Sequence, residues 1–164
     1  MSNKKRRCYW DACCFIDLIQ QTTSRIEVLE QLRSQAQRGE IDIVTSSYTL
    51  AEVIKDDKGA PVNDDDEQRI ATLFLEPYIG VRLLHRQVGN KARQIARAHS
   101  LKPGDAIHVA TAILEEADVL HTYDEKRLLK RNGVIGDPPL RIERPSVPQL
   151  EIPNHPARED DATT

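Results

Sequence analysis

Short apolar runs alternate along this chain with longer stretches in which apolar residues recur every three or four positions. The short runs are rich in β-branched and aromatic residues, and this composition is typical of buried strands. They lie at 7–10, 41–45, 78–84, 118–122 and 140–143. The pattern therefore predicts four strands, and the run at 140–143 could form a fifth.

The stretches between the runs have helical periodicity. They cover 13–38, the residues after Ser46 and Ser47, 65–75, 88–99, 105–116 and 125–130. Hydroxyl residues at 22–24 interrupt the first stretch and are suitable caps for a second helix. Strands that alternate with helices predict a three-layer α/β/α sandwich around a central, mainly parallel sheet of four to five strands.

Length and composition fit one folded domain followed by a tail. The chain has 164 residues, and we expect residues 1–144 to form the domain. Residues 145–164 are rich in proline and acids, so we expect them to be disordered. The net charge of −3 excludes a highly basic nucleic-acid coat, and an aromatic content of 4% leaves few platforms for base stacking.

The three cysteines, Cys8, Cys13 and Cys14, lie together near the N-terminus. An odd, clustered set without a downstream Cys/His pair predicts neither a disulfide framework nor a structural zinc site. Free thiols indicate a reducing compartment, so we expect a cytoplasmic protein. No apolar run approaches the roughly 20 residues that a membrane span needs, and no signal peptide is apparent.

Several motifs for other chemistries are absent from the sequence. The seven glycines form neither GxGxxG nor GxxxxGK[ST], which excludes the usual phosphate cradles of dinucleotide-binding and P-loop proteins. The GxSxG and HExxH motifs are absent as well. The residues that remain as candidates for a functional site are carboxylates.

Four acids follow or flank the predicted strands. Asp11 ends the first strand, and Glu52 lies in the helix after the second. Asp105 opens an alanine-rich helix, and Asp124 stands two residues past Thr122 at the end of the fourth strand. The carboxyl ends of parallel strands share one edge of a sheet, so these acids are expected to gather there. Clustered carboxylates need a hard cation such as Mg²⁺ or Mn²⁺, and such a site predicts water attack on a phosphodiester.

The chain resembles PIN domains in three segments, CYWDACCFIDLI, SSYTLAEVI and PGDAIHVATAILEEADVLHTYDEKRLLK, and the resemblance covers about residues 7–144. It implies a metal-dependent nuclease for single-stranded RNA, and small members resemble the toxins of VapBC toxin–antitoxin pairs. An antitoxin partner and a homodimer are implied in the same way. The acids of the family correspond to Asp11, Glu52, Asp105 and Asp124, with Thr122 as an auxiliary polar residue.

Two positions depart from the family pattern. Cys13 stands where a small hydroxyl residue is common, and Tyr123 stands between the threonine and the last acid in place of Asn or Arg. The hydroxyl is then missing or supplied by Ser46 or Ser47. A helix is predicted to follow these two serines, so either of them could instead cap that helix.

Each candidate also has a purely structural interpretation. Asp11, Asp105 and Asp124 could cap helices, and Glu52 could be a solvated helix residue. His108, one helical turn after Asp105, is more typical of a packed or surface histidine than of a ligand, and the cysteines pack as small apolar groups.

A basic stretch without acids separates Glu76 from Asp105. We expect this stretch and the residues after the fourth acid to bind RNA phosphates, although they could form a solvated helical face. The predicted RNA-binding residues are Arg86, Lys91, Arg93, Arg97, Lys102, Lys126 and Arg127. The sequence thus predicts an endoribonuclease, and the alternative is an inactive PIN-fold module that binds RNA or protein.

Overall fold

Five parallel strands form the centre of the molecule in a computed structural model that describes residues 4–22, 24–56 and 58–148. The strands are β1 (Arg6–Trp10), β2 (Ile41–Ser46), β3 (Ile79–Arg82), β4 (Val119–His121) and β5 (Ile142–Glu143). Their order in the sheet is β3-β2-β1-β4-β5, and every neighbouring pair is parallel. The predicted parallel sheet is confirmed.

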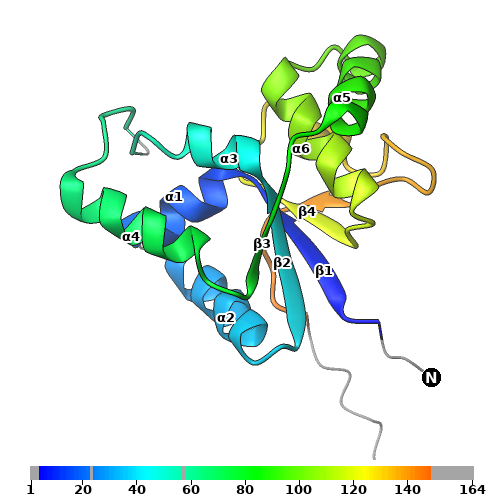
Figure 1. Ribbon diagram of the computed structural model, residues 1–164. Helices are drawn as coiled ribbons and strands as arrows, with labels where there is room; N and C mark the ends of the chain where they lie inside the picture. Colours follow the sequence, from blue (N-terminus) through cyan, green and yellow to red (C-terminus); the bar gives the residue numbers. More distant parts are fainter. Residues whose placement is uncertain (1–3, 23, 57, 149–164) are drawn as a thin grey trace, which may run out of the picture.

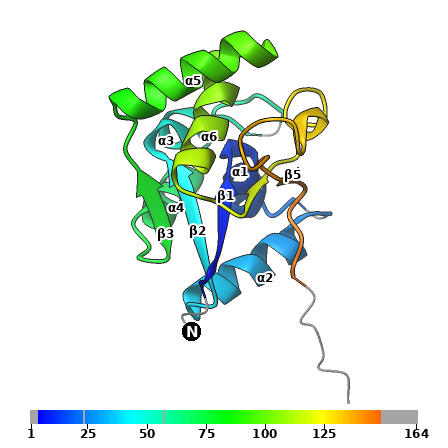
Figure 2. The same cartoon turned by 90° about the vertical axis from the view of Figure 1, so that its right-hand side faces the viewer.

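Helices cover both faces of the sheet. They are α1 (Ala12–Gln20), α2 (Ile26–Gln37), α3 (Ser47–Glu52), α4 (Asp64–Phe74), α5 (Arg86–His99), α6 (Pro103–Leu114) and the short 3₁₀ helix η1 (Leu129–Arg131). Helices α1, α2 and α4 lie on one face, and α5 and α6 lie on the other (Figures 1 and 2). The structure therefore has the three layers that the sequence predicts.

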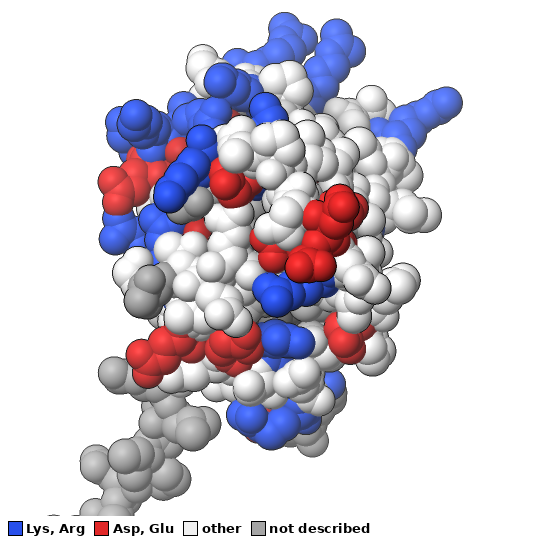
Figure 3. Space-filling model, turned by 90° about the vertical axis from the view of Figure 1, so that its left-hand side faces the viewer, with Lys and Arg blue, Asp and Glu red and all other residues white. Residues whose placement is uncertain are grey.

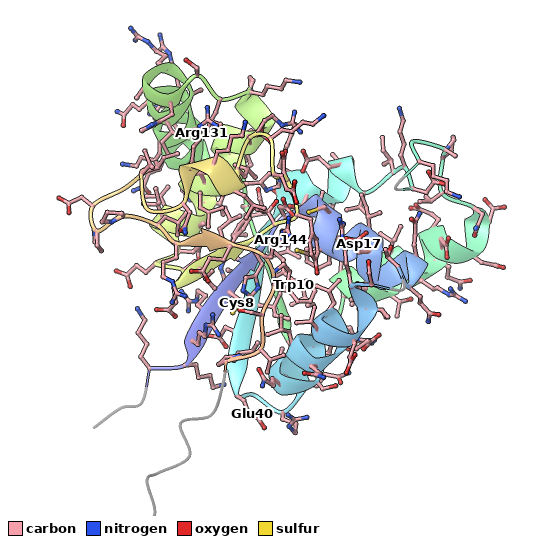
Figure 4. All side chains as sticks on the ribbon, turned by 180° about the vertical axis from the view of Figure 1, so that it is seen from behind. Cys8, Trp10, Asp17, Glu40, Arg131 and Arg144 are labelled. Carbon is pink, nitrogen blue, oxygen red and sulfur yellow. The ribbon has the colours of Figure 1, made fainter. Side chains whose placement is uncertain are left out.

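The alternation of side chains along β1 divides the core into two halves. Cys8 and Trp10 pack with α1, α2 and α4, whereas Tyr9 points to the opposite layer, under α6. All three side chains are buried, and Figure 4 shows Cys8 and Trp10 on β1 in the middle of the molecule. This period-two alternation is the reason that Tyr9 can reach residues of α6.

Some predicted elements have different limits in the structure. The predicted interruption of the stretch at 13–38 is confirmed: Gln21 adopts a left-handed conformation (φ 53°) that ends α1, and the N-cap position of α2 is Arg25, not one of the hydroxyl residues. A helix over 125–130 is wrong: turns precede the single 3₁₀ turn of η1.

The described chain continues a few residues past 144. Pro145 is buried, and Val147 packs against the core beside α1 and α2. Residues 149–164 of the predicted tail lie outside the described residues. No helix in the described ranges is long and apolar enough to cross a membrane.

Candidate metal centre

The carboxyl ends of β1, β2 and β4 meet at the edge of the sheet from which α1 and α3 begin (Figure 1). Asp11 follows β1, and its backbone N–H donates to the carbonyl of His121 at the end of β4 (3.4 Å). Thr122 comes next after β4, and Ser46 ends β2. Parallel pairing therefore places the residues that follow these strands side by side, as the sequence predicts.

Asp11 is buried and accepts hydrogen bonds on both carboxylate oxygens. The Cys13 thiol donates to Oδ1 at 2.7 Å, and the Thr122 hydroxyl donates to Oδ2 at 2.5 Å. Burial raises the pKa of Asp11, and these two hydrogen bonds act in the opposite direction. Although Asp11 stands at the N-cap position of α1, its side chain makes no cap hydrogen bond, so capping alone does not explain it.

Cys13 occupies the place of the expected hydroxyl. Besides its bond to Asp11, its sulfur accepts from the backbone N–H of Tyr123 at 3.2 Å. Ser46 caps α3 by accepting from Tyr48 N, and Ser47 accepts from the backbone N–H of Leu84. The expectation that a serine supplies the hydroxyl is therefore not met by these contacts, and packing as an apolar group is wrong for Cys13.

Thr122 links the first acid to the fourth. While its hydroxyl donates to Asp11, its Oγ1 accepts from the backbone N–H of Asp124 at 3.0 Å. Asp124 Oδ1 in turn accepts from the backbone N–H groups of Lys126 and Arg127. Asp124 thus caps a turn, as its structural interpretation predicts, and at the same time faces the other acids.

Asp105 lies in the first turn of α6, three residues after the N-cap position of Lys102, so it does not cap this helix. Its Oδ2 is buried, has no hydrogen bond within the described chain and lies 3.3 Å from Nε of Arg127. The same Nε donates to Asp124 Oδ2 at 2.8 Å. Burial raises the pKa of Asp105, Arg127 lowers it, and the charges of Asp124 and Glu52 raise it further.

Glu52, the last residue of α3, contacts a buried histidine. Its Oε2 lies 2.5 Å from Nε2 of His108, and Nδ1 of the same ring lies 2.8 Å from the Tyr9 hydroxyl. His108 lies on α6 one turn after Asp105, so the two residues share a face of the helix. The histidine is packed, as its structural interpretation predicts, but it is packed against a site residue.

The structure brings the four acids to one edge of the sheet, but their contacts there differ. Within the described ranges, Asp11, Cys13 and Cys14 are the group whose potential ligand atoms all lie within 4.8 Å of one another. Arg127 and His108 hold oxygens of the other three acids. A buried carboxylate with a raised pKa, and a buried carboxylate oxygen without a hydrogen bond, both fit a hard divalent cation.

The predicted RNA-binding residues lie beside this edge. Arg86, Arg93 and Arg97 are exposed on α5 and Lys91 is half-buried, while Lys102 and Lys126 are exposed on the following loops. Figure 3 shows Lys and Arg side chains gathered in the upper part of the molecule, over α5. Arg127 differs from the rest, because its guanidinium is paired with two acids.

Three contributors were not singled out from the sequence as site residues: Cys13, Tyr9 and His108. Cys13 has a local signal, since it stands two residues after Asp11 at a helix start. His108 also has one, since it follows Asp105 by one helical turn. For Tyr9, the only signal in the sequence is the alternation of side chains along a buried strand. This alternation predicts which layer of helices Tyr9 faces but not which residue it contacts.

The family of PIN domains matches residues 8–134 of the chain. No curated protein is similar enough in sequence to match it. Solved structures with a similar fold include a toxin–antitoxin complex from Klebsiella pneumoniae. It is 22% identical with a TM-score of 0.55, and the likeness covers 79% of this chain and 96% of that one.

Two further structures have the same fold. VapBC2 from Rickettsia felis, bound to a DNA fragment from its promoter, is 20% identical with a TM-score of 0.57, over 84% of this chain and 98% of that one. Mycobacterium tuberculosis VapC20, a sarcin–ricin loop cleaving toxin, is 14% identical with a TM-score of 0.58, over 73% and 91%. At these identities, the likeness shows the fold alone.

Proposed function

Because this chain belongs to the PIN domain family, whose members are nucleases, we propose that it is a divalent-metal-dependent endoribonuclease acting on single-stranded RNA. The observation that carries the proposal is the meeting of Asp11, Asp105 and Asp124 at one edge of the sheet, beside the exposed basic side chains of α5. Carboxylates for a cation and basic groups for phosphates are the two requirements of phosphodiester hydrolysis.

Asp11 and Asp105 are the principal ligands in this proposal, and Glu52 and Asp124 complete the set directly or through water. Mg²⁺ and Mn²⁺ both fit oxygen donors of this kind. Polarisation of a phosphoryl oxygen, and a lowered pKa for the attacking water, are the chemistry that such a cation supplies when bound.

The side chains of the protein carry out the other parts of the proposed reaction. The attacking water forms a bond to phosphorus while the bond from phosphorus to the leaving ribose oxygen breaks. A carboxylate accepts the proton that the water loses, and the leaving oxygen takes up a proton from solvent. Asp105 suits a ligand role better than Asp124, because its buried Oδ2 accepts no hydrogen bond, whereas both oxygens of Asp124 accept N–H groups. Thr122 holds Asp11 in place through its hydroxyl.

The fold of the solved toxin–antitoxin structures supports a more specific proposal, a VapC-like toxin with an antitoxin partner and a homodimeric state. The proposal places the protein in the cytoplasm, where its RNA substrate would be found. A small DNA-binding protein encoded beside this chain would support the pairing.

The test of the nuclease proposal compares two substitutions of the same chemistry. Asp105→Asn removes a site carboxylate, whereas Asp65→Asn removes an exposed carboxylate on α4. We expect the wild type and Asp65→Asn to cleave single-stranded RNA with Mn²⁺ and to stop in EDTA. Asp105→Asn should lose at least about 100-fold in rate, the usual cost of removing one essential charge-stabilising group.

The stability of the variants separates chemistry from folding. Burial raises the pKa of Asp105, so its ionised form costs folding free energy, and the metal-free Asp105→Asn variant should be no less stable than the wild type in urea unfolding. Full cleavage by Asp105→Asn would overturn the assignment of the site.

A second candidate, an inactive PIN-fold binding module, is favoured by one observation. Arg127 already supplies a positive charge to Asp105 and Asp124, and could replace a cation permanently. Calorimetry decides between the two candidates. Mn²⁺ binding by the wild type supports the nuclease, whereas RNA binding without any Mn²⁺ binding selects the module.

A further inference from the structure

A chain of three buried or half-buried side chains crosses from the sheet to α3 through α6. It begins at Tyr9 on β1, passes through His108 on α6 and ends at Glu52, the last residue of α3. These residues are 99 and 56 positions apart in the sequence, so the contact exists only in the folded domain. Tyr9 is fully buried and His108 is 3% exposed.

Which group donates and which accepts in each hydrogen bond follows from the chemistry of the groups at the two ends of this chain. When the Glu52 carboxylate is ionised it can only accept, so the N–H at Nε2 of His108 is the donor of the hydrogen bond to Glu52 at 2.5 Å. In the neutral ring Nδ1 is then the acceptor, and it receives the Tyr9 hydroxyl at 2.8 Å. The Tyr9 oxygen in turn accepts the backbone N–H of Ser46 at 3.2 Å, so each step in the chain has a donor and an acceptor.

Packing holds the imidazole ring in the same orientation. Tyr9 and Tyr48 both approach His108 edge to face, each with 5.8 Å between ring centroids. The Tyr48 hydroxyl packs against Gly104, where an added Cβ would lie 2.8 Å from its oxygen. The ring therefore has little freedom to turn away from Glu52.

We propose that His108 is a positioning residue that Tyr9 orients and that holds the Glu52 carboxylate toward Asp105 at the candidate metal centre. This inference rests on the proposed metal-dependent function. Glu52 is the most exposed of the partners in this chain, with 29% of its side chain accessible, and it ends a helix of only six residues. Without a fixed donor, its long side chain would lose rotamer entropy when a cation orders it.

Two substitutions of His108 distinguish positioning from simple packing. The amide nitrogen of Gln can take the place of Nε2, whereas that of the shorter Asn takes the place of Nδ1 and cannot reach Glu52. We expect His108→Asn to lower Mn²⁺ affinity in calorimetry by about 10- to 100-fold, the range seen when an outer-shell partner of a metal ligand is lost. His108→Gln should recover most of that loss, although both variants remove the imidazole.

A double-mutant cycle tests whether His108 acts through Glu52. In a Glu52→Gln background, His108→Asn should cause no further loss of Mn²⁺ affinity, because the carboxylate that it positions is gone. In cleavage assays His108→Asn should lower kcat and leave KM for RNA unchanged, since the variant keeps every basic side chain of α5. Tyr9→Phe should act in the same direction as His108→Asn, with a smaller effect.

The control is His99→Gln on α5, which should match the wild type in every measurement. Equal losses for His108→Asn and His108→Gln, or an additive cycle, would overturn the positioning role while leaving the nuclease proposal intact. A wild-type protein that neither binds Mn²⁺ nor cleaves RNA would instead overturn the nuclease proposal, and the positioning role with it.

Discussion

At the scale of single residues, Arg127 is the unusual feature of the candidate centre. Its guanidinium lies between Asp105 and Asp124, and the hydrogen bond to Asp124 is the main cause of its raised pKa. A basic residue three positions after the fourth acid was predicted to bind RNA. In the structure it binds the carboxylates of Asp105 and Asp124, so a metal bound as we propose would compete with the arginine for the same oxygens.

This competition predicts the effect of Arg127→Gln on metal binding. The arginine side chain is 45% exposed, so the pair contributes only about 0.5–1 kcal/mol. Its removal should therefore raise Mn²⁺ affinity by about two- to fivefold in calorimetry. Lys126→Gln is the matched control, because the neighbouring side chain makes no ion pair within the described residues and should leave the affinity unchanged. A lower affinity in Arg127→Gln would show that the guanidinium supports the site instead.

At the scale of elements, two groups of His121 on β4 differ in their hydrogen bonding: the backbone carbonyl has partners, and the imidazole has none among the described residues. The carbonyl of His121 accepts from Asp11 and Cys14, which ties β4 to the start of α1. The imidazole is fully buried, and neither of its nitrogens has a hydrogen-bond partner among the described residues. Burial lowers the pKa of His121 from 6.5 to about 3, so the folded protein holds this ring neutral.

The lowered pKa of His121 predicts a loss of stability in acid. Because the unfolded chain binds a proton near pH 6.5 and the folded chain does so only near pH 3, the contribution is present above pH 6.5 and lost as the pH falls. Between pH 7 and pH 5 the wild type should lose about 2 kcal/mol more unfolding free energy than His121→Leu. Urea titrations without metal measure this difference, with His99→Gln as control. Equal slopes for the wild type and His121→Leu would contradict it.

At two places in the described chain, the apolar pattern of the sequence does not predict where a helix ends or whether one forms. Residues 53 and 54 continue the apolar periodicity of α3, yet the helix ends at Glu52, and Val53 is buried while Ile54 is exposed. Around 125–130, Asp124 accepts the N–H groups of Lys126 and Arg127 and so favours a turn over a helix. Both outcomes depend on contacts between elements or side chains, which outweigh local propensity.

At the scale of the whole molecule, the net charge of −3 conceals an uneven distribution. The exposed basic residues of α5, together with Lys102 and Lys126 after it, make no ion pairs within the described chain. Arg33 on α2, Arg38 at its C-cap and Arg69 on α4 pair with acids nearby. Unpaired cations beside an acidic edge are suited to hold RNA phosphates while the acids hold a metal.

This distribution predicts the salt dependence of RNA binding. If Arg93 and Arg97 each contact one phosphate, replacing both with Gln should lower the slope of log Kd against log salt by about 1.4, at about 0.7 per contact. Fluorescence anisotropy in EDTA measures binding without cleavage. The double variant Arg38→Gln and Arg69→Gln removes the same charge from the C-cap of α2 and from α4, and should keep the wild-type slope. Identical slopes for both double variants would refute the role of α5.

The sequence by itself determined the layers of the fold and the edge of the sheet at which Asp11, Glu52, Asp105 and Asp124 gather. These follow from residue periodicity and from the rule that parallel strands end together, and both are readable along the chain. The tertiary structure alone decided the partners of those acids: Thr122 with Asp11, His108 with Glu52, and Arg127 with Asp105. Such contacts depend on how packed elements far apart in the sequence are spaced and on which rotamers they allow, and no local pattern records either.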